Sequence, residues 1–206
     1  MPSVYDLKPR FQGLLRPLVR AGVSHGVTPN QLTLAALLGS LAAGAALLLA
    51  RGRPTVLLVL PAWLLVRMAL NAMDGMAARE HALQSSLGAV LNELGDVLSD
   101  LALYLPLAIL SRGLRWAVVA FCLGAVLTEF AGVLGQALGA RRHFEGPMGK
   151  SDRAFVVGAL ALVTAFRPGL LAWWPAALGV AAALAGVTCV NRLAAALREL
   201  RGVSRP

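Results

Sequence analysis

The feature that most constrains this fold is a series of long apolar stretches separated by short polar breaks. A helix needs ~20 mainly apolar residues to cross the hydrocarbon core of a bilayer. Hydrophobic residues make up 58% of the chain and charged residues only 14%, whereas a soluble domain carries about 25% charged residues. The sequence therefore predicts an all-α integral membrane protein with six transmembrane helices, near Gln31–Ala50, Thr55–Met73, Leu87–Leu110, Leu114–Ala140, Arg153–Phe166 and Trp173–Ala195.

The segment ahead of the first span differs from the rest. Four apolar residues recur there at near-helical spacing, among arginines: Leu14, Leu15, Leu18 and Val19. This pattern suits a short amphipathic helix in the headgroup layer, with its arginines toward anionic lipid. A plain basic tail is the alternative. We expect one membrane domain over residues 1–206, with an interfacial segment at 1–30 and a six-helix bundle at 31–206.

The basic residues predict orientation rather than a nucleic-acid partner. The net charge is +9, but the basic residues fall mostly between apolar runs, without the aromatic-rich basic face of a nucleic-acid binder. If the N-terminus is cytoplasmic, the other side of the membrane holds only Arg51, Arg53, Arg112, Arg115 and Arg167. Because cytoplasmic loops carry the excess of Lys and Arg, we expect both termini, and the loops at 74–86 and 141–152, to face the cytoplasm of a bacterial-type membrane.

Acidic side chains gather where a membrane protein rarely places them. Asp74, Glu93, Asp96, Asp100 and Glu129 lie in or at the ends of predicted spans, and each such group costs at least ~2.5 kcal/mol at mid-membrane. Spacing of three or four residues puts them in rows along two helices, with Asn71 beside Asp74 and Asn92 beside Asp96 and Asp100. Two facing rows of oxygen atoms suit a hard cation such as Mg²⁺ or Ca²⁺.

The same residues carry a longer pattern. It resembles the signature D-x2-D-G-x2-A-R-x8-G-x3-D-x3-D of the CDP-alcohol phosphatidyltransferases, and every spacing matches. The matching positions are Asn71, Asp74, Gly75, Ala78, Arg79, Gly88, Asn92 and Asp96. The segment Thr28–Thr33 also looks like the family's entry into its first membrane helix.

The resemblance implies a membrane enzyme of phospholipid synthesis. Such an enzyme takes a CDP-linked lipid, here CDP-diacylglycerol, moves its phosphatidyl group to the hydroxyl of a polar alcohol, and releases CMP with the help of Mg²⁺ or Mn²⁺. It implies that Asn71, Asp74, Asn92 and Asp96 hold one or two metal ions, and that Gly75, Ala78, Arg79, Gly88 and Thr33 bind the CDP group. Asp96 would then be the general base, with Asp100 as an accessory catalytic residue. A homodimer is also typical of the family.

Two signature aspartates are replaced by Asn71 and Asn92, which removes two negative charges. Three interpretations remain open. One metal ion replaces a pair, or Glu93 or Asp100 supplies the missing charge, or catalysis is lost and the chain is a CDP- or lipid-binding membrane protein of the same fold. We favour activity, because an inactive chain would have little reason to keep four acids at an insertion cost.

Four basic residues in one predicted cytoplasmic segment indicate where the acceptor binds. They are Arg141, Arg142, Lys150 and Arg153. Arg and Lys side chains of this kind suit a phosphorylated acceptor, such as a sugar phosphate or glycerol phosphate. The alternative is that they are ordinary positive-inside residues in contact with lipid headgroups.

Overall fold

A computed structural model describes residues 4–50 and 53–203 of the chain, and Arg51 and Arg205 lie outside them. The chain is all-helical, with 86% helix and no strand in the described part. The α-helices are α1 Val4–Ser24, α2 Pro29–Leu49, α3 Val59–Glu80, α4 Ser86–Tyr104, α5 Arg115–Ala137, α6 Lys150–Phe166 and α7 Trp174–Val203. Short 3-10 helices link them: η1 Pro54–Leu58, η2 Leu105–Ile109, η3 Arg112–Leu114 and η4 Pro168–Trp173. The predicted all-α class is confirmed.

Four helical segments are long and apolar enough to cross a membrane: Pro29–Leu49, Thr55–Glu80, Arg112–Ala137 and Pro168–Gly202. They support the prediction of a membrane protein. Helix α4 carries Glu93, Asp96 and Asp100, which lower its hydropathy, and α6 has only 17 residues. That these two helices complete a set of six spans therefore remains a prediction.

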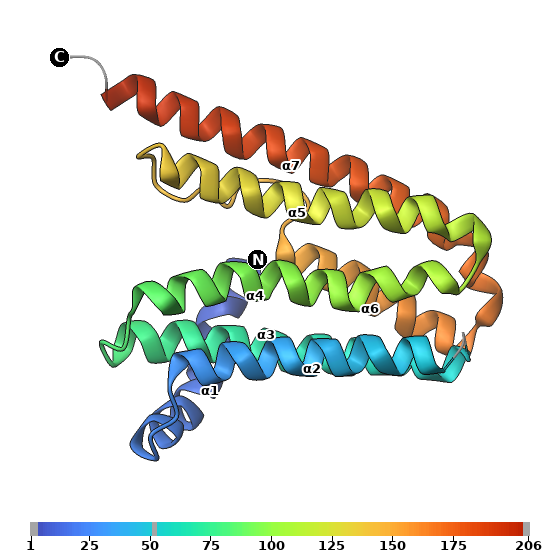
Figure 1. Ribbon diagram of the computed structural model, residues 1–206, viewed down its shortest axis with the longest axis horizontal. Helices are drawn as coiled ribbons and strands as arrows, with labels where there is room; N and C mark the ends of the chain where they lie inside the picture. Colours follow the sequence, from blue (N-terminus) through green and yellow to red (C-terminus); the bar gives the residue numbers. More distant parts are fainter. Residues whose placement is uncertain (1–3, 51–52, 204–206) are drawn as a thin grey trace.

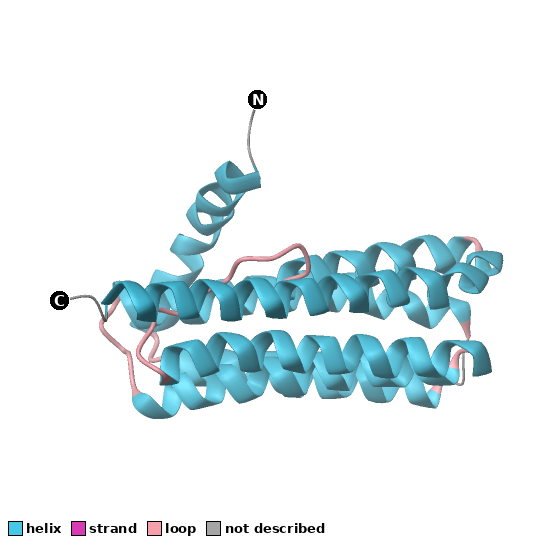
Figure 2. Cartoon of the chain, turned by 90° about the horizontal axis from the view of Figure 1, so that it is seen from above, coloured by secondary structure: helices cyan, strands magenta, loops and turns pink. Residues whose placement is uncertain are grey.

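The helices of the bundle run side by side along its length (Figure 1). The α1–α2 link, the α3–α4 turn, the end of α5 and the C-terminal end of α7 all lie at one end of the bundle. From that end, the α5–α6 loop runs back along the bundle, and α6 begins partway down its length (Figures 1 and 2). Because of this return path, α6 is short, and its first residues lie among the neighbouring helices instead of at the end of the bundle.

Prolines mark the ends of two helices, and one of these helices, α4, ends earlier than the hydropathy pattern predicts. The third predicted span, near Leu87–Leu110, is α4 up to Tyr104 followed by η2, in which Pro106 is an early residue. Proline lacks the N–H that would continue an α-helix. Helix α6 stops at Phe166, the predicted end of the fifth span, ahead of Pro168, and η4 follows.

Helix α1 leaves the bundle at an angle (Figure 2) and is held on α3 by one side of its surface. Leu15 and Val19 are buried in a cluster with Met76 and Ala77, whereas Leu14 and Leu18 are 76% and 58% exposed. Arg16 donates two hydrogen bonds to Glu80, with Nε–Oε2 and Nη2–Oε1 distances of 3.1 and 3.0 Å. Two apolar residues of this segment thus pack on the bundle, and the other two point away from it. Its place in the headgroup layer stays a prediction.

Close packing of α2 on α4 brings the polar ends of these helices together. A Cβ atom on Gly44 of α2 would lie 2.0 Å from the carbonyl oxygen of Ala102 in α4. Only glycine allows this approach, as is common where membrane helices pack tightly. The contact sets the distance at which Thr33, on the same helix as Gly44, faces α3 and α4.

Candidate functional site

The signature residues form one row on α3 and one on α4, and amide hydrogen bonds join the two rows. Asn71 of α3 donates from Nδ2 to Asp96 Oδ1 of α4 at 3.0 Å. In the opposite direction, Asn92 of α4 donates from Nδ2 to Asp74 Oδ2 of α3 at 3.3 Å. The predicted facing of the rows is therefore present in the fold, and each carboxylate accepts one amide N–H.

Asp74 has a second partner from α2. Thr33 Oγ1 lies 2.9 Å from Asp74 Oδ2. Thr33 is held in place because Thr28 and Gln31 form a capping box at the start of α2, which satisfies the first backbone N–H groups of the helix. A Cβ on Gly95 of α4 would lie 3.3 Å from the Thr33 methyl group. Three helices thus converge on Asp74.

Asp96 is bonded by two cationic side chains in addition to Asn71. Lys150 Nζ donates to Asp96 Oδ2 in a short ion pair. Arg67 Nη2 donates to the backbone oxygen of Asp96 at 3.0 Å and approaches its Oδ1 at 3.4 Å. Lys150 is the first residue of α6, so the return path of the α5–α6 loop brings an ammonium group to the signature helices.

Both carboxylate oxygens of Asp100, one turn further along α4, accept hydrogen bonds from arginines. Arg67 Nη1 donates to its Oδ1 at 2.5 Å, and Arg153 donates to its Oδ2 from Nε at 3.1 Å and from Nη2 at 2.9 Å. Buried carboxylates of this kind need such partners, because an unpaired charge would be very costly. The residue expected to assist catalysis is thus a buried counterion in this structure.

Arg153 also turns away from the place expected for an acceptor. Its side chain is 0% exposed, and besides Asp100 it donates to Glu129 Oε1 at 2.9 Å and to Thr128 Oγ1 at 2.8 Å. Glu129 in addition accepts from Arg142 at 3.2 Å and lies 3.7 Å from Arg192. These contacts tie α3, α4, α5, α6 and α7 together.

Sequence reasoning missed the pairing of Arg67 with Asp100 and the place of Arg192 in this network. Their signal was present in principle, since both are charged residues inside long apolar runs, and such residues usually pair inside the bundle.

A cavity of about 1910 Å³ opens beside the cross-linked rows. Residues that line it include most of the predicted site: Thr33, Asn71, Asp74, Gly75, Ala78, Arg79, Gly88, Asn92, Arg142 and Lys150. Asp96 does not line the cavity, but it is hydrogen-bonded to Asn71 and Lys150, which do. Asp100, Arg141 and Arg153 are not among the lining residues. The lining also includes Asn30 of α2, within the segment Thr28–Thr33, and Phe11 and Gln12 of α1, which no motif in the sequence singled out.

Two glycines keep this cavity open. A Cβ on Gly75 would lie 3.1 Å from Arg79 Nη2, and one on Gly88 would lie 2.8 Å from Asn30 Oδ1. Either addition would push a polar side chain from its place. A larger residue at either position would thus displace the end of a side chain that lines the cavity, Arg79 or Asn30.

The α5–α6 loop is fastened to the bundle at two points. Arg142 forms ion pairs with Glu93 of α4 and Glu129 of α5, and its guanidinium lies 5.3 Å from the centre of the Phe144 ring. Arg141, in contrast, is bound to Glu199 of α7: its backbone N–H donates to Oε1 at 3.1 Å, and its Nε lies 3.5 Å from Oε2.

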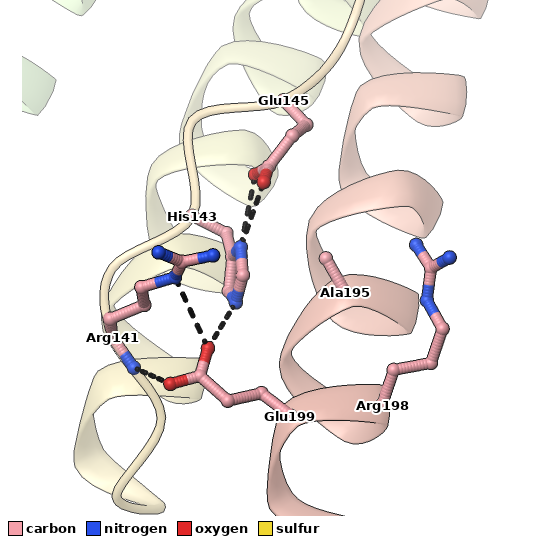
Figure 3. Close-up of a pocket in the computed structure, with 6 residues that line it drawn as sticks. All are labelled: Arg141, His143, Glu145, Ala195, Arg198 and Glu199. Atoms are coloured by element: carbon pink, nitrogen blue, oxygen red, sulfur yellow. Dashed lines mark hydrogen bonds and ion pairs between the residues drawn. The ribbon is translucent and has the colours of Figure 1, made fainter. Parts of the chain in front are cut away.

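His143 completes the second fastening (Figure 3). Its Nδ1 lies 2.9 Å from Glu145 Oε1, and its Nε2 lies 2.8 Å from Glu199 Oε2. Both ring nitrogens can donate only when the ring is protonated. The hydrogen bond to Glu145, and further the one to Glu199, raise the pKa of His143. The His143 bond lowers the pKa of Glu145 in turn.

Fold and site together define a helical membrane protein with a carboxylate–amide cavity at one end of its bundle. The chain belongs to the CDP-alcohol phosphatidyltransferase family, whose model it matches over residues 26–185. It is 45% identical over 190 residues to the inner membrane protein YnbA of Escherichia coli (strain K12), covering 92% of this chain and 94% of that one. Together with the apolar helices, this relative supports a bacterial inner membrane protein.

Solved structures of similar fold include the phosphatidylinositol phosphate synthase PgsA1 of Mycobacterium tuberculosis. With CDP-DAG bound, it superimposes with a TM-score of 0.76 at 22% identity, over 93% of this chain and 98% of that chain. Its complex with manganese and citrate gives the same TM-score and identity, over 93% of each chain. At this identity the likeness establishes the fold.

Proposed function

We propose that this protein transfers a phosphatidyl group from CDP-diacylglycerol to the hydroxyl of a polar, phosphorylated acceptor and releases CMP. The observation that carries the proposal is the convergence of seven of the eight signature residues of α3 and α4, with Thr33, Arg142 and Lys150, on one cavity. The eighth, Asp96, is hydrogen-bonded to Asn71 and Lys150. Family membership supports phosphatidyl transfer from a CDP-linked lipid. So does the CDP-DAG bound to the structural neighbour.

The donor would lie along the rows of α3 and α4. Gly75, Ala78 and Gly88 leave space for the nucleotide, Arg79 offers hydrogen-bond donors beside it, and Thr33 lines the same space. The cavity, at about 1910 Å³, exceeds the ~300–1,000 Å³ of ordinary small-molecule pockets. A lipid-linked nucleotide together with a second substrate requires such room.

The residues present also fit a divalent cation. Asp74 and Asp96 offer carboxylate oxygens, and Asn71 and Asn92 offer amide oxygens, all hard ligands of the kind that Mg²⁺, Mn²⁺ and Ca²⁺ take. Among residues 4–50 and 53–203, no three His, Cys, Asp or Glu side chains form a metal cluster, and a cation held here would take the amide oxygens as ligands beside the two carboxylates. Bound there, a cation supplies charge neutralisation for the diphosphate and the departing CMP.

The chain's own groups would perform the transfer. Asp96 accepts the proton of the acceptor hydroxyl, whose oxygen forms a bond to the phosphorus that carries diacylglycerol. The bond from this phosphorus to the CMP oxygen breaks, and CMP leaves. Lys150 and Arg142 hold the phosphate of the acceptor, because both line the cavity. We assign Arg153 and Asp100 the task of holding α6 against α4, and Arg141 that of fastening the loop.

The inactive alternative keeps one specific observation in its favour. Each signature carboxylate already accepts an amide N–H, and Asp96 pairs with Lys150. A protein with this arrangement that only binds CDP or lipid would be stabilised by CDP without turnover. The two functions therefore differ in a measurable way.

Release of CMP tests the proposal. Purified protein is incubated with radiolabelled CDP-diacylglycerol, Mg²⁺ or Mn²⁺, and a panel of sugar phosphates, glycerol phosphate and uncharged polyols. We expect metal-dependent CMP release that is fastest with a phosphorylated acceptor. Failure with every acceptor, alongside protection by CDP against thermal unfolding, would establish the binding protein instead.

A further inference from the structure

The charges around the signature differ from those of a four-aspartate site. Asn71 and Asn92 are neutral, so Asp74 and Asp96 carry the only negative charges at the four ligand positions. Lys150 adds a positive charge directly on Asp96. This region therefore offers a cation two carboxylates, one of which, Asp96, already has the ammonium of Lys150 and the guanidinium of Arg67 as partners.

Neighbouring acids do not restore the missing charge. Asp100 is bonded by both Arg67 and Arg153. Glu129 is surrounded by arginines of three elements: Arg142 of the loop, Arg153 of α6 and Arg192 of α7. Glu93 is paired with Arg142. Of the three interpretations left open by the sequence, supply of charge by Glu93 or Asp100 is therefore disfavoured.

The backbone at the start of α6 places Lys150 beside Asp96. Lys150 opens α6 directly after the cap at Gly149, whose N–H is bonded to Asp152 Oδ2 at 2.9 Å. Its side chain is 34% exposed and lines the cavity while its ammonium reaches Asp96. The group is thus placed to act on an anionic ligand in the cavity and on Asp96 at once.

We propose that this site binds a single divalent cation between Asp74 and Asp96, and that Lys150 supplies the positive charge that a second cation would give a four-aspartate site. The inference rests on the proposed function for its setting, since it concerns the same cavity. One divalent cation neutralises two carboxylates. A second at a distance of a few ångströms would be repelled strongly, because Asn71 and Asn92 bring no charge to offset it. Lys150 and the cation share Asp96, so they also compete for it.

Binding of Mn²⁺ to the purified, detergent-solubilised chain tests the proposal without any substrate. Electron paramagnetic resonance, together with elemental analysis, should find one Mn²⁺ per chain with the spectrum of an isolated ion. Asp74→Asn should remove it, which locates the ion. In the double variant Asn71→Asp/Asn92→Asp, two ions should bind and broaden the spectrum through spin coupling. Two coupled ions in the unchanged protein, or one ion that survives Asp74→Asn, would overturn the proposal.

The role proposed for Lys150 is tested by measuring the affinity of its variants for Mn²⁺. Lys150→Gln should bind Mn²⁺ about tenfold more tightly, since a competing charge is gone, and yet release CMP more slowly. Lys150→Arg, which keeps the charge, should retain the original affinity. Weaker Mn²⁺ binding in Lys150→Gln would contradict the competition. If two ions bind and CMP is released, this inference fails while the proposed function stands. If one ion binds and no CMP is released, the single-cation site stands while the proposed function fails.

Discussion

Asp96 and Asp100 show that spacing in the sequence alone decides little about the role of a residue. Both lie on one face of α4, four residues apart, and the sequence correctly placed them in one row with Asn92. Asp96 faces Asn71 and Lys150 beside the cavity, whereas Asp100 is enclosed by Arg67 and Arg153. The sequence could not separate them, because only the bundle brings their partners close. The partners of Asp100 lie 33 and 53 positions away, and Asn71 and Lys150 lie 25 and 54 positions from Asp96.

The two residues should respond differently to the same change. Asp96→Asn is expected to abolish CMP release, because an amide cannot accept the hydroxyl proton, while CDP still protects the protein against thermal unfolding. The matched variant Asp100→Asn should chiefly lower stability, by ~3–5 kcal/mol, because Arg67 and Arg153 would lose their buried counterion. Thermal unfolding and CMP assays on both variants measure this. Full activity of Asp96→Asn would exclude it as the general base.

At the scale of elements, apolar runs predicted where helices lie better than where they end. The runs near Gln31–Ala50 and Leu114–Ala140 correspond closely to α2 and α5. The bounds of α4 and α6 depend on Pro106 and Pro168, and the position of α6 depends on a loop that returns along the bundle. Hydropathy reports the length of a run and carries no information on such a path. For this reason the approach of Lys150 to Asp96 was not foreseen.

The packing of α2 on α4 depends on Gly44. Gly44→Ala is expected to lower the stability by ~1–3 kcal/mol, because its Cβ would meet the Ala102 carbonyl oxygen at 2.0 Å and overpacking strains the backbone. Since the same contact positions Thr33 beside Asp74, CDP protection should weaken as well. The control is Gly186→Ala on α7, where nothing lies within 4 Å of the added carbon. Equal melting temperatures for the two variants would show that this packing is not limiting.

The fastening of the α5–α6 loop at His143 should depend on pH. Its folded pKa is raised above the ordinary value of about 6.5. The stabilisation is therefore fully present below about pH 6.5 and is lost as the pH rises through the higher folded pKa. Arg141, Arg198, Glu145 and Glu199 face the same pocket. Melting temperatures between pH 6 and 9 should fall more steeply for the unchanged protein than for His143→Gln. Parallel curves would contradict this.

For the whole molecule, the arrangement of its ends makes the predicted topology testable. The α3–α4 turn and the C-terminal end lie together, and the α4–α5 link lies at the opposite end of the bundle (Figure 1). With Cys122 and Cys189 replaced, Ser111→Cys should react with a membrane-impermeant thiol reagent added to intact spheroplasts, and Gln84→Cys should react only after lysis. The reverse pattern would place the cavity on the periplasmic side.

Family and broad architecture were accessible from the sequence because they depend on local patterns: apolar runs, the signature spacing and the distribution of arginines. The charge network joining α3 to α7 was not accessible, since it is made by long-range partners such as Arg67, Arg153 and Arg192. That network encloses Asp100 and Glu129 among buried arginines, whereas Asp96 pairs with Lys150, which lines the cavity. It is the reason why Asp74 and Asp96, rather than all the acids in the spans, form the centre of the proposed site.

The most direct measurement of the central claim is the lipid product itself. Proteoliposomes containing CDP-diacylglycerol are incubated with Mg²⁺ and the acceptor that gives the fastest CMP release, and the lipids are analysed by mass spectrometry beside an Asp96→Asn control. We predict a new phospholipid, equal to the phosphatidyl group joined to the acceptor, formed in a one-to-one ratio with CMP and absent from the control. CMP accompanied only by phosphatidic acid, or no new lipid with any acceptor, would contradict the assignment as a phosphatidyltransferase.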